Sequence, residues 1–235
     1  MTLPKIEKPL FELLVPSMKK SVKARPFVVR EEKILLTAQQ SGAEKDIILA
    51  IKQVLNNCII DEFDVDDLAT FDLEYMFLKL RARSVNNVIK VSYRDNEDDK
   101  VYDFEIDLDE VELKVEDNIS NIINVTDTIG IKMKYPSVTI LDNVPDTDNA
   151  GDVVEYLIKS CIDQIFDEEN VYPVKDHTDQ ELNEFLDSLD IETFNKIRDF
   201  FDNLPQMYYK MEYTNKNGNV RVIELTTLND FFIWG

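Results

Sequence analysis

The apolar positions along the chain alternate between stretches of helical spacing and stretches of strand spacing. Residues 70–84 carry apolar side chains on two helical faces, with Leu73, Phe77 and Leu80 on one and Tyr75, Leu78 and Ala82 on the other. A helix that is apolar on more than one face packs against partners on more than one side. The pattern therefore predicts a central helix, with Thr70 as its N-cap and other elements laid around it.

Amphipathic helices are predicted on both sides of this central helix. Helical spacing recurs in residues 31–40, 44–58 and 153–166, and in two helices that follow Thr178 and Asp190. Ser41-Gly42 should end the first of them, because glycine readily adopts the left-handed conformation at a helix end. Thr178 and Glu181 have the spacing of a capping box, and Asp190 is a good N-cap for the last helix.

Alternation of apolar and polar residues predicts strands in two regions. In the first, we expect one small antiparallel sheet with a solvated acidic face, made of residues 89–93, 102–108, 111–115 and 129–135. In the second, residues 209–213 and 220–225 flank Asn217-Gly218, which is a strong signal for a hairpin turn. The fold class that follows is α+β, a helical body with a small antiparallel β-sheet inserted and a C-terminal β-hairpin.

Shifts in composition divide the chain further. Four prolines keep residues 1–30 out of helical structure and predict an extended arm with two short strands. We divide the chain into a basic N-terminal arm with the start of the first helix (1–36), a helical region (37–86), a small β module (87–141), an acidic helical region (142–206), and a C-terminal hairpin with an aromatic tail (207–235).

Charge limits the kinds of partner. The net charge is −21, although residues 1–36 hold eight Lys and Arg against four Asp and Glu, so that the rest of the chain is −25. An excess of carboxylates disfavours binding to nucleic acid, which depends on Lys and Arg neutralising phosphates. No apolar run is long enough to span a membrane. We therefore expect no nucleic-acid partner, no membrane-spanning segment, and either high solubility or a basic partner.

Candidate chemistry is sparse. His177, the only histidine, is interpreted as a solvated loop residue, and Cys58 and Cys161 lie in apolar helical patterns typical of buried free thiols. The acidic run from Asp146 resembles a calcium loop, but Ala150 and Leu157 stand where oxygen ligands belong. Residues 95–99 are interpreted as a solvated turn. Motifs of nucleotide-binding loops and hydrolases do not occur, so we expect no enzyme activity, no catalytic residue, no metal and no cofactor.

One run of residues also carries a family resemblance. Residues 72–84, read as D-x-E-Y-x-F-L-x-L-R-A-x-S, resemble a signature of the small baseplate-hub assembly proteins of T4-like contractile-tailed phages. Further blocks fit the same family in order, at residues 22–38, 57–58, 135–136, 181–189 and 200–205. Proteins resembling this family often carry Cys-x-x-Cys at hairpins shaped like those of zinc ribbons. The corresponding residues 93–98 and 211–217 contain no cysteine here, so we expect no zinc.

The resemblance implies a non-enzymatic function. It implies a chaperone-like factor that acts in the host cytoplasm during tail assembly and binds the tape-measure protein or other baseplate hub proteins. One alternative is a permanent structural subunit of the hub, located in the virion tail baseplate. Another, from a different class, is an acidic DNA mimic, which would need its carboxylates in rows at phosphate spacing. The sequence predicts no oligomeric state.

The residues expected to bind a partner lie in three places. They are Arg25, Phe27 and Arg30 in the basic arm, Arg81 and Arg83 at the end of the central helix, and Phe231, Phe232 and Trp234 in the aromatic tail. A basic block on an acidic chain attracts an acidic surface, and aromatic residues often anchor interfaces. The alternative is that both termini pack on their own domain and that the helix-end arginines serve the helix dipole.

Overall fold

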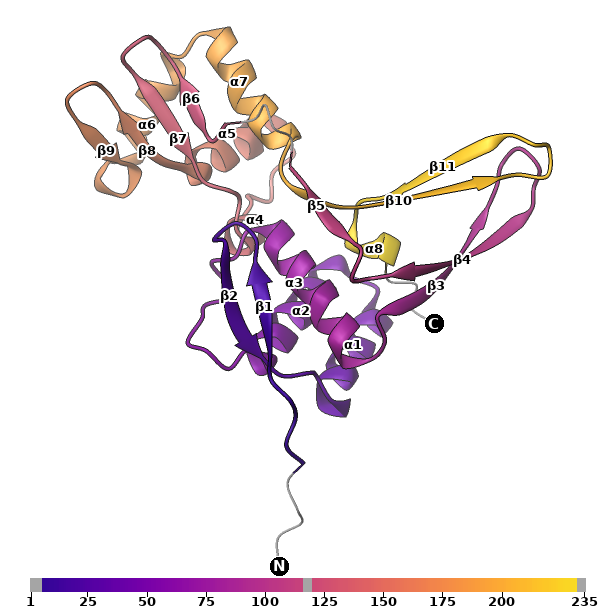
Figure 1. Ribbon diagram of the computed structural model, residues 1–235. Helices are drawn as coiled ribbons and strands as arrows, with labels where there is room; N and C mark the ends of the chain where they lie inside the picture. Colours follow the sequence, from indigo (N-terminus) through magenta and orange to yellow (C-terminus); the bar gives the residue numbers. More distant parts are fainter. Residues whose placement is uncertain (1–5, 116–119, 232–235) are drawn as a thin grey trace, which may run out of the picture. The chain divides into compact units, whose positions relative to one another are not determined.

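The computed structural model describes residues 6–115 and 120–231 (Figure 1). The chain divides into two compact units. Unit 1 combines the described residues of 1–114 with those of 206–235, and unit 2 contains those of 115–205. Helices and small antiparallel sheets occur in both units, which confirms the α+β class. Among the described residues, no helix is long and apolar enough to cross a lipid bilayer.

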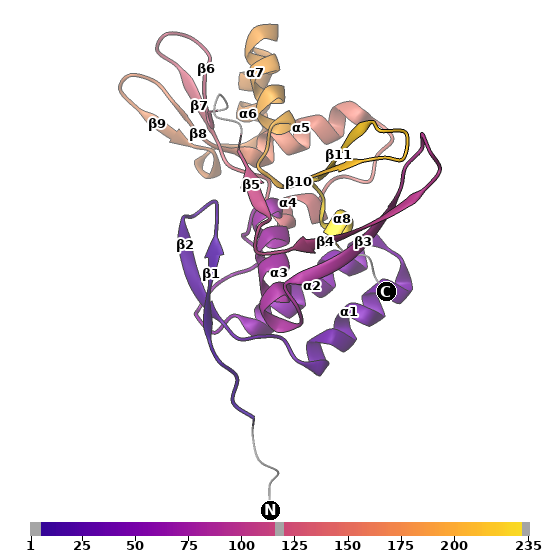
Figure 2. The same ribbon diagram turned by 45° about the vertical axis from the view of Figure 1, so that its right-hand side comes forward.

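Helix α3, Thr70–Ser84, is the centre of unit 1 and has the predicted bounds. It packs against α2, β1 and β10, and views from two directions show these elements around it (Figures 1 and 2). Its buried side chains cover several faces: Phe71, Leu73, Met76, Phe77, Leu78, Leu80 and Ala82. The predicted N-cap is wrong, because Ala69 occupies that position and Thr70 is already helical. The central helix itself is confirmed.

Two helices and a hairpin precede α3. Helices α1, Val29–Ser41, and α2, Glu44–Cys58, are joined at Gly42, whose φ of 68° lies in the left-handed region. The two short strands predicted in the N-terminal arm are confirmed, although the second one lies at residues 20–24 and Val29 already begins α1. Strands β1, Phe11–Val15, and β2, Lys20–Ala24, pair as a hairpin. Its turn is tied to α3, because the Ser17 backbone N–H donates to the buried carboxylate of Asp72 at 2.9 Å and the Ser17 hydroxyl donates to the same group.

Three more strand pairings complete unit 1. One hairpin is β3, Val88–Arg94, with β4, Val101–Asp107, and the other is β10, Gln206–Thr214, with β11, Val220–Leu225. Strand β5, Glu112–Lys114, pairs with β10, and a short helix α8, Leu228–Phe231, follows β11. The single sheet predicted over residues 89–135 is wrong, because its four strands belong to three different sheets.

Unit 2 is a four-stranded antiparallel sheet with helices packed on it. The sheet has the order β6, Ile122–Asn124; β7, Gly130–Met133; β8, Ile162–Phe166; and β9, Val171–Pro173. The helices are α4, Val138–Asp142; α5, Ala150–Cys161; α6, Asp179–Asp187; and α7, Ile191–Asp202, with a 3-10 turn at Val174–Asp176. The core combines Ile123, Ile131, Met133, Ile158, Cys161, Ile162, Ile197 and Phe200.

The helix predicted over residues 153–166 is wrong at its C-terminal end. It stops at Cys161, and residues 162–166 form β8, which pairs with β7 through Ile131 and Ile165. Apolar residues at 158, 161, 162 and 165 fit a helix as well as a helix followed by a strand. The partner strand therefore decides the structure, which local spacing does not reveal. The capping box of Thr178 with Glu181 and the cap at Asp190 are confirmed.

Candidate functional site

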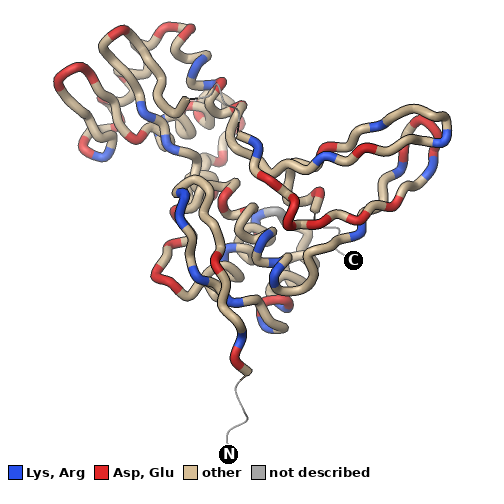
Figure 3. Tube along the Cα trace, in the orientation of Figure 1, with Lys and Arg blue, Asp and Glu red and all other residues tan. Residues whose placement is uncertain are grey.

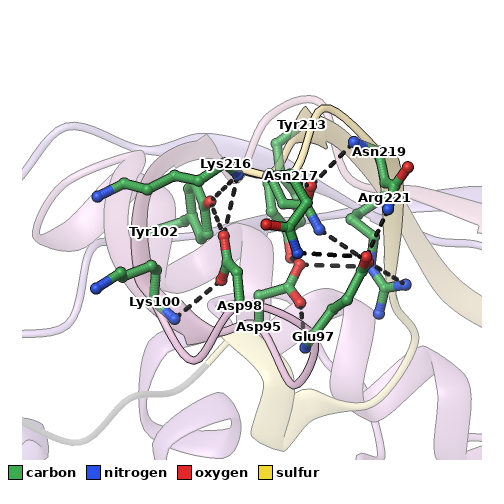
Figure 4. Close-up of polar contacts among 11 residues, drawn as sticks. Asp95, Glu97, Asp98, Lys100, Tyr102, Tyr213, Lys216, Asn217, Asn219 and Arg221 are labelled. Atoms are coloured by element: carbon green, nitrogen blue, oxygen red, sulfur yellow. Dashed lines mark hydrogen bonds and ion pairs between the residues drawn. The ribbon is translucent and has the colours of Figure 1, made fainter.

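The tips of hairpins β3–β4 and β10–β11 are joined by a dense polar cluster within unit 1 (Figure 4). We call it the hairpin clasp: Asp95, Glu97, Asp98 and Tyr102 from the first hairpin, with Tyr213, Asn215, Lys216, Asn217, Asn219 and Arg221 from the second. Gly218, with φ of 84°, closes the second turn in the left-handed region, where glycine is favoured. The clasp links residues about 120 positions apart in sequence.

Asp95 is the buried centre of the clasp. Its carboxylate accepts a hydrogen bond from the Tyr213 hydroxyl at 2.5 Å and from the Glu97 backbone N–H at 2.7 Å. Arg221 Nε lies 3.4 Å from the same carboxylate. The Tyr213 and Glu97 donors lower the pKa of Asp95, against the opposing effect of burial. Burial and the neighbouring Asp95 raise the pKa of Tyr213 to about 12, so the pair is a carboxylate accepting from a neutral phenol.

Glu97 and Asp98 extend the clasp on either side. Asn215 donates to Glu97 at 2.9 Å, and the side-chain amide of Asn219 donates to it as well. Asp98 accepts from the Lys216 backbone N–H at 3.0 Å and from the Tyr102 hydroxyl at 2.5 Å. These side chains therefore satisfy backbone and amide groups of the opposite turn, which Figure 4 shows as dashed lines between the two hairpins.

Aromatic rings support the polar contacts. The Tyr213 ring lies against those of Tyr93, Tyr102 and Phe104, with centroid distances of 6.3, 4.6 and 5.4 Å. Aromatic packing thus contributes to the clasp, and the interpretation of residues 95–99 as a solvated turn is wrong for Asp95, which is fully buried. Within residues 6–115 and 120–231, no group of three or more His, Cys, Asp or Glu is placed to hold a metal ion.

The Tyr213 hydroxyl should be needed for the clasp. Tyr213→Phe removes the donor to buried Asp95 and leaves that carboxylate short of one partner. We expect a lower thermal midpoint by circular dichroism. Tyr208→Phe is the matched control, because Tyr208 lies on the same strand and donates to Glu224 at an exposed site. An equal loss of stability in both variants would contradict a special role for Asp95.

The two arginines among the predicted partner-binding residues of the basic arm lie beside one carboxylate. Glu31 is fully buried and lies 3.0 Å from Arg25 and 2.8 Å from Arg30. Arg25 also donates to the Asn57 carbonyl at 2.9 Å. Phe27 is buried, and its backbone N–H donates to Ser84 at 3.0 Å, which joins the arm to the end of α3. Arg25 and Phe27 therefore have structural contacts, whereas the Arg30 side chain is 69% exposed.

The remaining predicted residues differ in accessibility. Arg81 is half-buried, and burial lowers its pKa, while Arg83 is exposed and lies 3.8 Å from Asp109. Phe231 is buried in unit 1, as expected if the tail packs on its own domain. Phe232 and Trp234 lie outside the described residues. Partner binding by these residues stays a prediction, for which Arg30 and Arg83 present the most accessible charges.

Two of the concave sites in unit 2 have mostly apolar linings. The larger is a groove of about 600 Å³ between α5, α6 and α7, lined by apolar residues with a few polar ones. The smaller, of about 250 Å³, is lined in part by Tyr172 and by His177, which is half-buried rather than fully solvated. Its carboxylates already have partners: Asp167 accepts from Tyr172 at 2.8 Å, and Glu181 accepts from the Thr178 N–H at 2.8 Å. His177 itself lies 3.8 Å from Glu181, so the polar groups of the smaller site contact one another.

The two cysteines need no partner. Cys58 and Cys161 are buried free thiols, as predicted, and burial raises their pKa values to about 11 and about 12. A thiol with a raised pKa stays protonated at neutral pH and is a poor nucleophile. Both side chains therefore serve as small apolar core residues.

The comparisons with known proteins give one match. The model of the family described as "T4 bacteriophage base plate protein" matches residues 8–233. No curated protein and no solved structure matches the chain at a significant level. The match spans both units, including the central helix, the hairpin clasp and the groove of unit 2. The chain therefore belongs to the T4 bacteriophage base plate protein family.

Proposed function

We propose that this protein is a non-enzymatic, chaperone-like factor that helps to assemble the baseplate hub of a phage tail. It would act in the host cytoplasm by binding the tape-measure protein or other hub proteins. The observation that carries the proposal is the family match over residues 8–233, which relates the whole described fold to the baseplate. The sequence resemblance to hub assembly proteins supports the narrower role.

The surface of the protein supports a binding role. Unit 2 has an open apolar groove, and unit 1 presents the exposed arginines Arg30 and Arg83. Acidic positions are spread along turns, strands and helices of both units (Figure 3), which favours contacts with proteins over mimicry of a regular phosphate backbone. A site of this kind binds and releases a partner and needs no catalytic group.

A permanent subunit of the baseplate hub is the second candidate, because the family description names a base plate protein. Quantitative mass spectrometry separates the two roles. An assembly factor should be abundant in infected-cell lysate, co-purify with hub or tape-measure protein, and be missing from purified virions. A subunit should be present in virions at a fixed ratio to other baseplate proteins. Failure to co-purify with any tail protein, together with absence from virions, would contradict both.

The C-terminal tail offers a test of the predicted binding residues. A chain ending at Phe231 keeps the buried side chain, whereas a chain ending at Asp230 loses it. We expect the second truncation to lower the free energy of unfolding by about 1.5–3 kcal/mol relative to the first, the cost of exposing one large apolar residue. If the tail binds a partner, both truncations should abolish co-purification with tail proteins. A stable chain ending at Phe231 that still co-purifies would exclude the tail from the interface.

A further inference from the structure

Unit 2 is far more acidic than unit 1. Residues 115–205 hold 21 Asp and Glu against six Lys and Arg, a net charge of −15, whereas the rest of the chain holds 26 against 20, a net charge of −6. Such a field attracts cationic partners and repels a second copy of the same unit. The partner of any surface on unit 2 is therefore expected to be basic.

The groove of unit 2 leaves large apolar side chains open to solvent. Val154 on α5 and Phe194 on α7 are each 43% exposed, and both line the groove. Leu186 and Leu189 form part of the same lining. The volume of about 600 Å³ lies within the range of roughly 300–1,000 Å³ that is usual for ligand sites. Exposed apolar side chains concentrated in one groove are characteristic of an interaction site.

Carboxylates accompany the apolar lining. Glu155 and Asp187 line the groove, and no Lys or Arg is among the described residues that do so. The nearby Lys159 is already engaged, since its ammonium lies 2.8 Å from Glu155 and donates to Asn183 at 2.9 Å. The groove therefore combines an apolar lining with the negative charge of Asp187, while Glu155 is already paired with Lys159.

We propose that this groove binds an amphipathic helix of a partner protein, with its apolar face on Val154, Leu186 and Phe194 and with Lys or Arg beside Asp187. The walls of the groove are helices, so they offer side-chain pockets for residues at helical spacing rather than a strand edge. The inference deepens the proposed function and rests on it for the source of the helix, a tail protein. The groove itself can be tested without that source.

Three synthetic helices of about 18 residues, roughly five turns, serve as probes. The first has a leucine face and a lysine face, the second keeps the leucines but carries glutamate, and the third keeps the lysines but replaces leucine by glutamine. Binding of each labelled peptide to the full-length protein is measured by fluorescence anisotropy. We expect the first to bind at least about tenfold more tightly than either of the others, a difference of about 1.4 kcal/mol. Equal binding of the first and third would overturn the proposal, because charge alone would explain it.

A matched pair of variants locates the binding site. Val154→Lys places a charge in the groove, whereas Val171→Lys makes the same change on β9, where Val171 is 56% exposed and does not line the groove. We expect Val154→Lys to weaken binding of the first peptide by about tenfold or more and Val171→Lys to change it by less than about twofold. Equal weakening by both variants, or by neither, would overturn the assignment to the groove.

Two further measurements show whether each variant is folded and whether the groove is used in assembly. The thermal midpoint of each variant shows whether it is folded, and Phe194→Ser replaces Val154→Lys if the latter is not. Co-purification with tail proteins from infected cells is then measured for the same variants. If the groove variants no longer bind the peptide but still co-purify with tail proteins, the groove is not the site used in assembly and the inference is overturned. The proposed function then still stands. If the intact protein binds the peptide but no tail protein, the proposed function fails instead.

Discussion

Replacing Phe77 by alanine should lower the free energy of unfolding by about 3–5 kcal/mol, the cost of deleting a large aromatic side chain from a packed core. Phe77 is fully buried in α3, which packs against α2, β1 and β10. A cavity at this position would remove contacts with helices and strands at once, and the surrounding structure can collapse only in part. Urea unfolding followed by circular dichroism measures the change.

Two leucine-to-alanine variants compare a buried position of unit 1 with an exposed one. Leu80→Ala removes a fully buried side chain of α3 and should cost about 2–5 kcal/mol. Leu36→Ala makes the same change on α1, where the side chain is 45% exposed, and should cost clearly less, below about 1 kcal/mol. Similar costs at both positions, or a cost below about 1 kcal/mol for Phe77→Ala, would mean that α3 is not the centre of the core.

The sequence predicts α3 well because the evidence for it is local. Apolar side chains on several helical faces, acidic residues in the first turn and basic ones in the last lie within residues 70–84. Strand partners are a different problem, since alternation shows that a segment is a strand but not which strand it pairs with. Alternation thus predicts a strand at residues 111–115, but it does not predict that β5 pairs with β10, nearly 100 positions later.

The hairpin clasp and the Glu31 network show a second limit of sequence reasoning. Charged residues are usually exposed, so the sequence predicts a solvated turn at residues 95–99. Asp95 is buried because Tyr213, 118 positions away, and Arg221 satisfy it, whereas the buried Glu31 is satisfied by Arg25, only 6 positions away. The sequence around Asp95 gives only a weak signal of this burial. That signal is the concentration of tyrosines and asparagines at two hairpin tips, which favours contact between the tips. Long-range hydrogen bonds leave little trace in local spacing.

Replacing Glu31 by glutamine should cost about 3 kcal/mol at neutral pH, the lower end of the range for breaking a buried ion pair. The carboxylate holds Arg25 and Arg30 at 3.0 and 2.8 Å and accepts the Val28 backbone N–H at 3.0 Å. Glutamine keeps the shape but removes the charge, so the largely buried Arg25 loses its counter-ion. Arg30 also loses this counter-ion, but its side chain is 69% exposed and is solvated by water. The expected cost therefore lies at the lower end of the range for buried ion pairs.

The cost of Glu31→Gln should also depend on pH. Burial would raise the pKa of Glu31, but hydrogen bonds from Arg25, the Val28 N–H and Arg30 outweigh it and lower the pKa from 4.5 to about 2. A carboxylate whose pKa is lower in the folded state contributes stability above its unfolded pKa and loses it as the pH falls. The stability difference between wild type and variant should thus be constant above pH 4.5 and shrink towards pH 2.

Glu32→Gln is the control for both parts of the Glu31 prediction, because Glu32 is the exposed neighbour on the same helix. It should change the free energy of unfolding by less than about 0.5 kcal/mol, as is usual for surface substitutions. Urea titrations of the three proteins between pH 2 and pH 7 provide the comparison. A cost of Glu31→Gln that stays the same down to pH 2 would show that it comes from packing rather than from the ionised carboxylate, since most of the stability linked to ionisation is lost once the pH falls to the folded-state pKa of about 2.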